Sequence, residues 1–538
     1  MPRLRFRRVR WAVGATLAIT GIVIARASIR AADDAASGWP SYNRTLTSDR
    51  YSPLDQINRS NVGKLKQLCV FDLGVDVSFQ AGPIVIGRVL YATTDREIFA
   101  IDADTCGLKW REREEGPPLG LRVNRGAAYL DGRLFRGTGE GNVIAYDAAS
   151  GRKIWTQKIA DSAKGESVPA APIAWNGLVF IGTAGGDRFA VSGRMYALEA
   201  ATGKVVWETY TVPTDAPQPG NEKAQALARA TWANTNDAPI SGGGTWTSYT
   251  LDPERGMLYV PVGNPAPDFT LSVRAGDNLY TNSVLILDAK TGIYRNHYSL
   301  VPADFHDWDL AAAPAVITSK SGKRIVAATP KDGLLYAYDL STDQRLFATA
   351  VTSRENVDLP LTTSPTRFCP GATGGSEWNG PAYSPDTNAF FTGAVDWCST
   401  VALDPAELAK KPAQSWTGAQ LANQFGRKDL NWSGWVTATD ADTGRVKWKF
   451  HAGAPVVSGV TPTKGGLVFT ADLDKHAYAF DAASGRVLWQ TELPGPAGGG
   501  VITYLVDGKQ RVAFVAGTRS AAFPVTPASG KIVIFGLQ

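Results

Sequence analysis

One phrase recurs along the chain and restricts its fold more than any other feature. A short apolar strand leads into D-x-x-[TS]-G and then into a second strand that ends in Trp, as in AYDAASGRKIW (145–155) and ATDADTGRVKW (438–448). The Gly supplies the left-handed backbone that a tight hairpin turn needs, and the acidic side chain can cap the turn. Each phrase therefore predicts a β-hairpin, and its recurrence predicts a repeat architecture.

The phrase occurs five times in full and twice as a weaker copy without the terminal Trp, LDAKTGIYR (287–295) and YDLSTDQRLF (338–347). Its acidic residues follow one another at spacings of 45, 52, 89, 51, 101 and 41 residues: Asp102, Asp147, Glu199, Asp288, Asp339, Asp440 and Asp481. We interpret each long spacing as two periods, so that eight or nine units fit the chain. Further short strands between the phrases, such as GLVFIGTA (177–184), give about four antiparallel strands per unit.

Four strands in a unit of about 45 residues are typical of a propeller blade. The sequence therefore predicts an all-β fold, an eight-bladed β-propeller in which the terminal Trp of each phrase docks neighbouring blades. The alternative, a string of separate β-sandwiches, would need linkers that are not found between the units.

The first 32 residues have a composition of their own. They hold seven Arg and no acidic residue, and residues 11–25 are an apolar stretch. Fifteen residues span about 22 Å as a helix, less than the roughly 30 Å apolar core of a membrane. We therefore expect 1–32 to be a cleaved export signal in preference to a membrane anchor, and 33–538 to be one domain in the periplasm. The Arg7-Arg8 pair leaves both the Sec route and the twin-arginine route open.

Without that segment the chain has 48 basic and 50 acidic residues, which argues against a nucleic-acid-binding surface. Export also bears on the four cysteines. Pairing Cys69 with Cys106, and Cys369 with Cys398, closes loops of about 30 to 40 residues, as disulfides of exported proteins do. The alternative is four buried free thiols. No two cysteines have zinc-knuckle spacing, and C-x-x-C-H, the haem-attachment motif, is absent from the sequence.

The Trp-ended phrase resembles the docking motif of the quinoprotein dehydrogenases, which bind pyrroloquinoline quinone (PQQ). The resemblance runs from WPSYNRTLTSDRYSPLDQINRSNVGKL (39–65) to VAFVAG (512–517), and its most specific parts are VGNPAPDF (262–269) and DFHDWDLAAAP (304–314). In the family, the Asn of the first motif binds calcium and the Asp of the W-D pair is the catalytic base. The resemblance therefore implies Asn264 as a metal ligand, and Asp309 as the base and a further metal ligand.

The resemblance implies a third metal ligand at Asp187, in GTAGGDRF, where the family has a Glu that is one methylene longer. Lanthanide-using relatives carry an additional acid two residues after the base, and this chain has Ala311 there. The resemblance therefore implies calcium in preference to a lanthanide. We interpret Asp304 and Asp307, in the same segment as the base, as turn caps.

Other matches imply a cofactor pocket. Trp246, in GGGTWTSYTLDP, corresponds to the Trp on which the quinone stacks, and Arg125, in RVNRGAAYLDG, to an Arg that pairs with a cofactor carboxylate. Lys331, in TPKDGLLYAYD, corresponds to a catalytic cation beside the reactive carbonyls, while Gln80 and Gly185 correspond to positions beside the cofactor.

Three departures from the family concern the upper part of this pocket. The vicinal Cys pair of many relatives is replaced by Leu119-Gly120, Val457 stands where a subgroup has Trp, and Ala184 replaces a hydroxyl residue. These departures leave the class of alcohol open.

The resemblance implies a dehydrogenase that oxidises an alcohol to an aldehyde or ketone with PQQ and calcium. Because the chain has no haem-attachment motif, we expect a separate cytochrome c to accept the electrons. An alternative substrate is a polymeric or secondary alcohol, of the polyvinyl alcohol type. An alternative of another class is a non-enzymatic scaffold of the cell envelope, since outer-membrane assembly propellers carry similar repeats.

Overall fold

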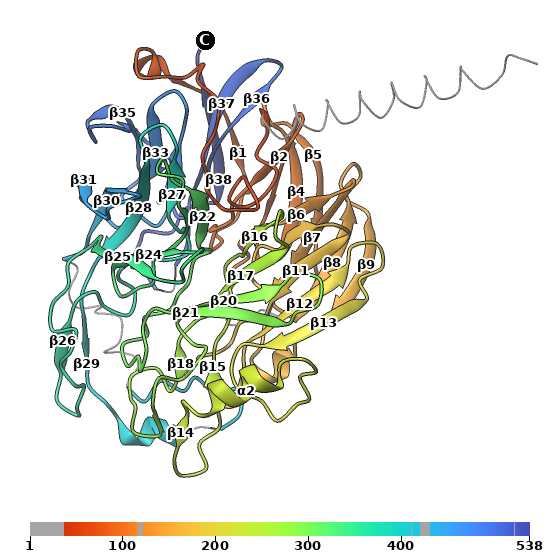
Figure 1. The fold of residues 1–538 in the computed structure, drawn as a ribbon. Helices are drawn as coiled ribbons and strands as arrows, with labels where there is room; N and C mark the ends of the chain where they lie inside the picture. Colours follow the sequence, from red (N-terminus) through yellow and green to blue (C-terminus); the bar gives the residue numbers. More distant parts are fainter. Residues whose placement is uncertain (1–36, 117–121, 410, 420–430, 521) are drawn as a thin grey trace, which may run out of the picture.

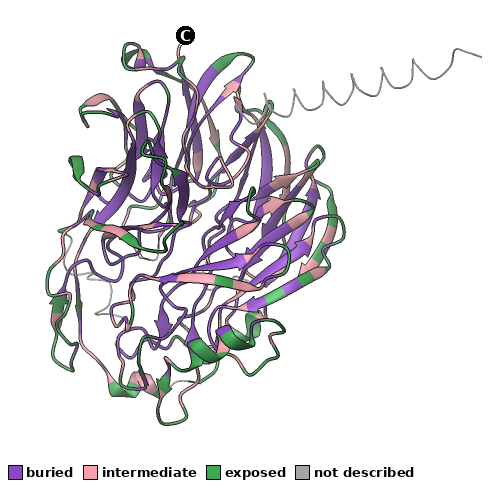
Figure 2. Cartoon of the chain, viewed as in Figure 1, coloured by how far each residue is buried: buried purple, intermediate pink, exposed green. Residues whose placement is uncertain are grey.

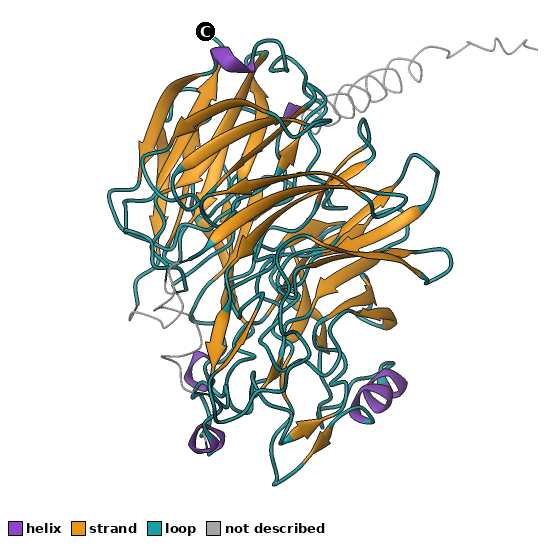
Figure 3. Ribbon diagram, turned by 90° about the vertical axis from the view of Figure 1, so that its left-hand side faces the viewer, coloured by secondary structure: helices purple, strands orange, loops and turns teal. Residues whose placement is uncertain are grey.

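The computed structural model describes residues 37–116, 122–409, 411–419, 431–520 and 522–538. Within these ranges, eight four-stranded antiparallel sheets follow one another along the chain (Figure 1). This arrangement confirms the predicted eight-bladed β-propeller. Helices are few, and Figure 3 shows how much of the molecule is strand.

The strands of the first four blades pair in chain order, and only the fourth blade has other strands inserted between its own: β2 (Ile84–Ile86), β3 (Val89–Thr93), β4 (Glu97–Asp102), β5 (Leu108–Arg113); β6 (Ala128–Leu130), β7 (Arg133–Gly137), β8 (Asn142–Asp147), β9 (Lys153–Lys158); β10 (Ile173–Trp175), β11 (Leu178–Gly182), β12 (Arg194–Glu199), β13 (Val205–Tyr210); β16 (Thr250–Asp252), β17 (Met257–Pro261), β20 (Ser283–Asp288), β21 (Tyr294–Ser299).

The remaining four blades follow the same antiparallel pattern: β22 (Ala315–Thr318), β23 (Arg324–Ala328), β24 (Leu334–Asp339), β25 (Arg345–Ala350); β27 (Ala382–Ser384), β28 (Ala389–Asp396), β30 (Ser433–Asp440), β31 (Val446–Ala452); β32 (Thr461–Pro462), β33 (Leu467–Ala471), β34 (His476–Asp481), β35 (Val487–Glu492); β36 (Val501–Val506), β37 (Lys509–Ala516), β38 (Lys531–Gly536), β1 (Lys66–Asp72). In Figure 2 the blade strands are largely buried and the connections carry most of the exposed residues.

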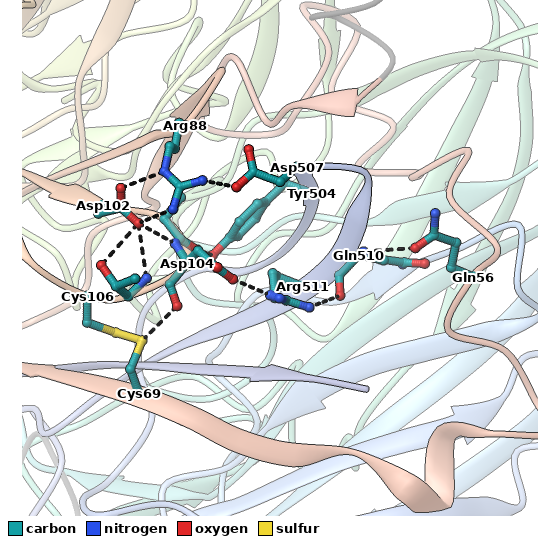
Figure 4. Close-up of polar contacts among 12 residues, drawn as sticks. Gln56, Cys69, Arg88, Asp102, Asp104, Cys106, Tyr504, Asp507, Gln510 and Arg511 are labelled. Carbon is teal, nitrogen blue, oxygen red and sulfur yellow. Dashed lines mark hydrogen bonds and ion pairs between the residues drawn. A yellow bond between two sulfur atoms is a disulfide. The ribbon is translucent and has the colours of Figure 1, made fainter. Parts of the chain in front are cut away.

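The last blade closes the ring with a strand from the other end of the chain. β1 pairs with β38, with Val70 opposite Val533. The Cys69–Cys106 disulfide then joins this blade to the turn between β4 and β5 of the first blade. Arg511 Nε donates to Asp104 Oδ1 at 2.8 Å across the same junction (Figure 4). Covalent and ionic contacts thus hold the two ends of the chain together.

The second disulfide, Cys369–Cys398, links the two strands of a small sheet outside the blades, at one end of that sheet. That sheet pairs β26 (Thr366–Phe368) with β29 (Ser399–Val401). Both predicted disulfides are therefore present in the structure, and the described residues include no free cysteine.

The repeated phrase forms the contact between neighbouring blades, as predicted. Its terminal Trp donates Nε1–H to a carbonyl in the turn of the next blade at 3.0 to 3.1 Å, in four pairs: Trp110–Ala148, Trp155–Ala200, Trp207–Ala289 and Trp448–Ala482. The indole also covers the turn Gly of that blade. A methyl group on Gly203, for example, would lie 2.6 Å from the Trp155 ring.

We expect Gly203→Ala to lower the free energy of unfolding by about 2 to 5 kcal/mol, because it adds a clash with Trp155 to the cost of a left-handed Ala. Gly132→Ala is the matched control. Both glycines have φ +78°, but nothing lies within 4 Å of a methyl group on Gly132, so its cost should be about 1 to 2 kcal/mol. Equal losses for the two variants in urea unfolding would contradict the docking role.

The interpretation of the two long spacings as additional blades is wrong. Glu199 and Asp288 lie in consecutive blades, and so do Asp339 and Asp440. The extra residues form insertions: α2 (Glu222–Arg229), β14 (Ala233–Asn234), β15 (Ser241–Gly242), β18 (Pro265–Ala266), β19 (Arg274–Ala275), β26, β29 and the 3-10 helix η3 (Pro405–Leu408). The count of eight holds because the last blade, closed by β1, has no copy of the phrase.

The insertions lie toward the lower end of the molecule in Figure 1. Backbone hydrogen bonds join them to the blade connections there, since Trp416 N donates to Asp187 O at 2.8 Å and Phe269 N donates to Thr417 O at 2.9 Å. Two further 3-10 turns, η1 (Val62–Lys64) and η2 (Ser162–Lys164), complete the described elements.

Residues 1–32, where the export signal is predicted, lie outside the described residues, and the division at residue 33 stays a prediction. None of the helices in the described ranges is long and apolar enough to cross a membrane.

Candidate active site

The antiparallel order of the blades decides which connections can build a site. Within a blade the turn of the repeated phrase joins the third and fourth strands at one end of the propeller, whereas the connection of the second and third strands and the crossing to the next blade both lie at the opposite end. Every predicted site residue lies on a connection of this second kind.

The predicted residues come together in one cavity of about 1160 Å³. They reach it from connections spread over six blades, and all of them line it: Gln80, Arg125, Gly185, Asp187, Trp246, Asn264, Asp309 and Lys331. Gly185 has φ +113°, and a methyl group there would lie 2.6 Å from the Gly165 carbonyl oxygen, so only glycine lets this loop bring Asp187 to the cavity.

Asp309 is buried and held by three donors. Its Oδ1 accepts from Trp246 Nε1 at 3.3 Å and from the Asn264 backbone N–H at 3.1 Å, and its Oδ2 accepts from Lys331 Nζ at 2.7 Å. Gly263 has no side chain that could block this approach, because a methyl group there would lie 2.4 Å from Asp309 Oδ1. The carboxylate is thereby fixed in one orientation at the cavity wall.

Lys331 provides the positive charge beside this carboxylate. Burial alone would lower its pKa, but the carboxylates of Asp307, Asp309 and Glu377 raise the pKa well above its usual value. Lys331 is therefore an ammonium ion that stabilises charge on oxygen atoms around it.

Arg125 is a buried cation that faces the cavity without a carboxylate partner in the described residues. Its guanidinium carbon lies 4.9 Å from the Trp246 ring centre and 4.5 Å from that of Trp378. Burial lowers its pKa to about 10, so it stays charged at neutral pH. Its Nε and Nη1, and Gln80 Oε1, have no hydrogen-bond partner in the structure. These atoms fit a flat, acidic ligand such as PQQ, which carries carboxylates.

A second group of oxygen donors lies beside Asp309. Carboxylate oxygens of Asp187, Asp268 and Asp307 all lie within 4.8 Å of one another, and Asn264 Nδ2 donates to Asp268 Oδ1 at 3.0 Å. Burial, and then repulsion from Asp309, raises the pKa of Asp187 to about 6. Burial and neighbouring carboxylates raise the pKa of Asp268 and Asp307 well above its usual value. Such a donor set suits a hard cation such as calcium.

The interpretation of Asp307 as a turn cap is therefore incomplete, because its carboxylate also faces this cluster and lies 3.6 Å from Lys331 Nζ. Asp304 does cap the turn as predicted, since its side chain accepts from the backbone N–H groups of His306 and Trp308, both at 2.9 Å. Asp268 was missed, although it stands four residues after Asn264 in the quoted motif.

Glu377 and Trp378 were also missed by sequence reasoning. They lie in the 101-residue spacing that we had assigned to a further blade, and they line the same cavity. Burial raises the pKa of Glu377 to about 7, with Asp309 adding to the rise and Lys331 and Arg125 opposing it. Glu377 is thus a second carboxyl group in the cavity, one that titrates near neutral pH.

This shift predicts a pH-dependent stability of the cofactor-free protein. The folded-state pKa of Glu377 lies above its ordinary value of 4.5. Its favourable contribution to the free energy of unfolding is therefore complete below pH 4.5 and is lost as the pH rises through about 7. Glu377→Gln should therefore gain about 1 to 3 kcal/mol of unfolding free energy relative to wild type between pH 5 and pH 8. Exposed Glu115→Gln is the control. The same pH profile in wild type and Glu377→Gln would contradict the assignment.

The structure describes two of the three positions at which the upper pocket departs from the family pattern. Ala184 lines the cavity, and Val457 is buried in an apolar cluster with Trp378 and Trp397. Leu119 and Gly120 lie outside the described residues.

Comparison with known proteins identifies the family of this chain. A sequence profile described as "Glucose/ethanol/alcohol dehydrogenase, beta-propeller domain" matches residues 39–352. The quinohemoprotein alcohol dehydrogenase ADH-IIG of Pseudomonas putida is 31% identical over 91% of this chain and 74% of its own length. The chain belongs to the PQQ-dependent alcohol dehydrogenases. The solved structure of ADHIIG has a TM-score of 0.85 at 27% identity, covering 95% of this chain and 82% of that one.

Some relatives of this chain are named for a lanthanide ion. A lanthanide-dependent methanol dehydrogenase of Methylacidiphilum fumariolicum (strain SolV) is 29% identical over 89% of this chain and 84% of its own length. A europium-containing methanol dehydrogenase has a TM-score of 0.79 at 26% identity, covering 93% of this chain and 98% of that one. A second profile, described as outer membrane protein assembly factor BamB, matches only residues 433–530.

Proposed function

We propose that this PQQ-dependent alcohol dehydrogenase is an exported, calcium-using enzyme in which Asp309 is the catalytic base. The observation that carries the proposal is the convergence of a fixed carboxylate, two cations, an indole and a group of oxygen donors in one cavity. A scaffold of the cell envelope would have no reason to collect these groups.

Asp309 would accept the hydroxyl proton of the alcohol. When bound, PQQ supplies the electrophilic carbonyl that takes up the hydride of the same carbon. The three donors to Asp309 hold its carboxylate in place, which removes the cost of orienting a base in each turnover. Lys331 would stabilise negative charge that develops on nearby oxygen atoms, as preorganised cations do in buried sites.

The remaining residues would bind the two cofactors. Trp246 offers a flat apolar surface, and Arg125 offers two N–H groups without a partner in the described structure, suited to a carboxylate. Gln80 and Gly185 line the same cavity. Asp187, Asn264 and Asp309 would supply oxygen ligands to the cation, for which we propose calcium on the basis of Ala311.

The electron acceptor we propose is a separate cytochrome c in the periplasm. Two disulfides and the arginine-rich segment before residue 33 support export. The substrate is an alcohol, and a secondary or polymeric alcohol is the alternative to a small primary one.

The test is reconstitution of the mature protein with PQQ and calcium, followed by dye-coupled oxidation of primary, secondary and polymeric alcohols. We expect PQQ to quench tryptophan fluorescence through Trp246 and turnover to require both additions. If the protein binds PQQ but oxidises no alcohol, the proposed activity is wrong. If it binds no PQQ, the assignment of the cavity as the cofactor site is wrong.

A further inference from the structure

The cluster of Asp187, Asp268 and Asp307 carries more negative charge than the described residues around it balance. Its three carboxylates come from three different connections. Asp309, on the same connection as Asp307, adds a fourth carboxylate beside them. The ion pairs that reach this group come from one side chain, Lys331, at 2.7 Å from Asp309 and 3.6 Å from Asp307. Asp268 is buried and Asp307 is half-buried, and an unbalanced charge in such surroundings is costly, so this arrangement calls for a cation.

Nearby Arg274 does not fill that need. Its guanidinium donates to the backbone carbonyls of Pro267 and Asp304 and to Asn278 Oδ1. Arg274 therefore braces the loops behind the cluster and makes no ion pair with Asp268 in the described structure.

The spacing of the donors fits one ion. Oxygen ligands lie about 2.3 to 2.6 Å from calcium, so two ligands on opposite sides of it are at most about 5 Å apart. The oxygens of the three aspartates, all within 4.8 Å of one another, meet this condition. The Asn264 amide lies among them, because its nitrogen donates to Asp268 Oδ1 at 3.0 Å. Rotation of this amide by half a turn would direct its oxygen to the same point.

We propose that Asp268 and Asp307 bind the cation directly, together with Asp187 and Asn264. The proposal rests on the cation of the proposed function and extends its ligand set beyond Asp187, Asn264 and Asp309. Three carboxylates suit a trivalent ion as well as calcium, and a trivalent ion loses more binding energy than a divalent one when a charge is removed.

The experiment measures metal binding by the PQQ-free protein, with no reading of activity. Calcium is titrated by calorimetry and terbium by luminescence, in wild type, Asp268→Asn, Asp307→Asn and Asp187→Asn. Asp76→Asn is the matched control, since Asp76 lines the same cavity but lies outside the cluster. We expect Asp268→Asn and Asp307→Asn each to weaken calcium binding at least tenfold and terbium binding more, with Asp76→Asn within twofold of wild type.

Thermal unfolding separates a ligand from a structural carboxylate. Asp268 has no ion pair in the described structure, so Asp268→Asn should raise the Tm of the metal-free protein, whereas Asp307→Asn also loses the ion pair with Lys331 and should raise it less. Added calcium should raise the Tm of both variants less than that of wild type. Asp268→Ser serves if Asp268→Asn does not fold, and Asp307 gives an independent reading.

The experiment distinguishes a failure of the extended ligand set from a failure of the proposed cation site. If Asp187→Asn weakens calcium binding while Asp268→Asn and Asp307→Asn leave it unchanged, the extended ligand set is wrong and the cation site of the proposed function stands. If wild type binds neither ion, with or without PQQ, both are wrong.

Discussion

Replacing Asp309 with Asn is expected to lower kcat by about 10²- to 10⁴-fold, the range that a general base contributes. Asn has nearly the same shape, so the contacts with Trp246 Nε1 and the Asn264 backbone N–H can persist. Its amide, however, cannot take a proton from the alcohol. The measurement is steady-state dye reduction at saturating PQQ and calcium, together with PQQ affinity from fluorescence titration.

Asp95→Asn is the control for the Asp309 variant, because Asp95 lines the cavity away from the base and its variant should keep wild-type turnover. PQQ affinity of Asp309→Asn should stay within about fivefold of wild type. Turnover that survives in Asp309→Asn would move the base to another carboxyl group, and Glu377 would be the first to examine.

Replacing Arg125 with Met should weaken PQQ binding by about 2 to 4 kcal/mol, which is roughly 30- to 1000-fold. The guanidinium is buried between Trp246 and Trp378, and two of its nitrogen atoms have no partner in the described structure. A carboxylate of the ligand would give it one. Met fills much of the same volume, so the indole packing is largely kept while the charge and the donors are lost.

Two comparisons sharpen the Arg125 experiment. Arg125→Lys keeps the charge but not the planar fork, so its affinity should lie between those of wild type and Arg125→Met. Arg113→Met is the control, because Arg113 lies at the cavity edge and already pairs with Glu97. Unchanged PQQ affinity in Arg125→Met would contradict its place at the cofactor.

Sequence reasoning predicted the blades well because their signal is local. The turn Gly, its acidic cap and the terminal Trp of each phrase make contacts that recur from blade to blade, such as Trp155 on Gly203. The last blade has no phrase, and its closure by β1 joins residues more than 450 positions apart. No local pattern records such a pairing.

The same distinction applies to the site. Asn264, Trp246 and Asp309 were predicted because they stand in specific motifs, and the structure brings them into one cavity. Glu377 stands in a long insertion without a motif, and only the tertiary fold places it near Lys331 and Arg125. Asp268 and Asp307 resemble ordinary turn residues in sequence. Their charge becomes informative only when three separate loops meet.

The most direct test of the account is a single turnover without an electron acceptor. The protein is loaded with PQQ and calcium, mixed with an alcohol that the panel identifies, and followed by PQQ absorbance and carbonyl product. We expect bound PQQ to be reduced with one equivalent of aldehyde or ketone formed per PQQ, and to be reduced at least a hundredfold more slowly in Asp309→Asn. Bound PQQ that stays oxidised with every alcohol, or an equal reduction rate in the variant, would contradict the account.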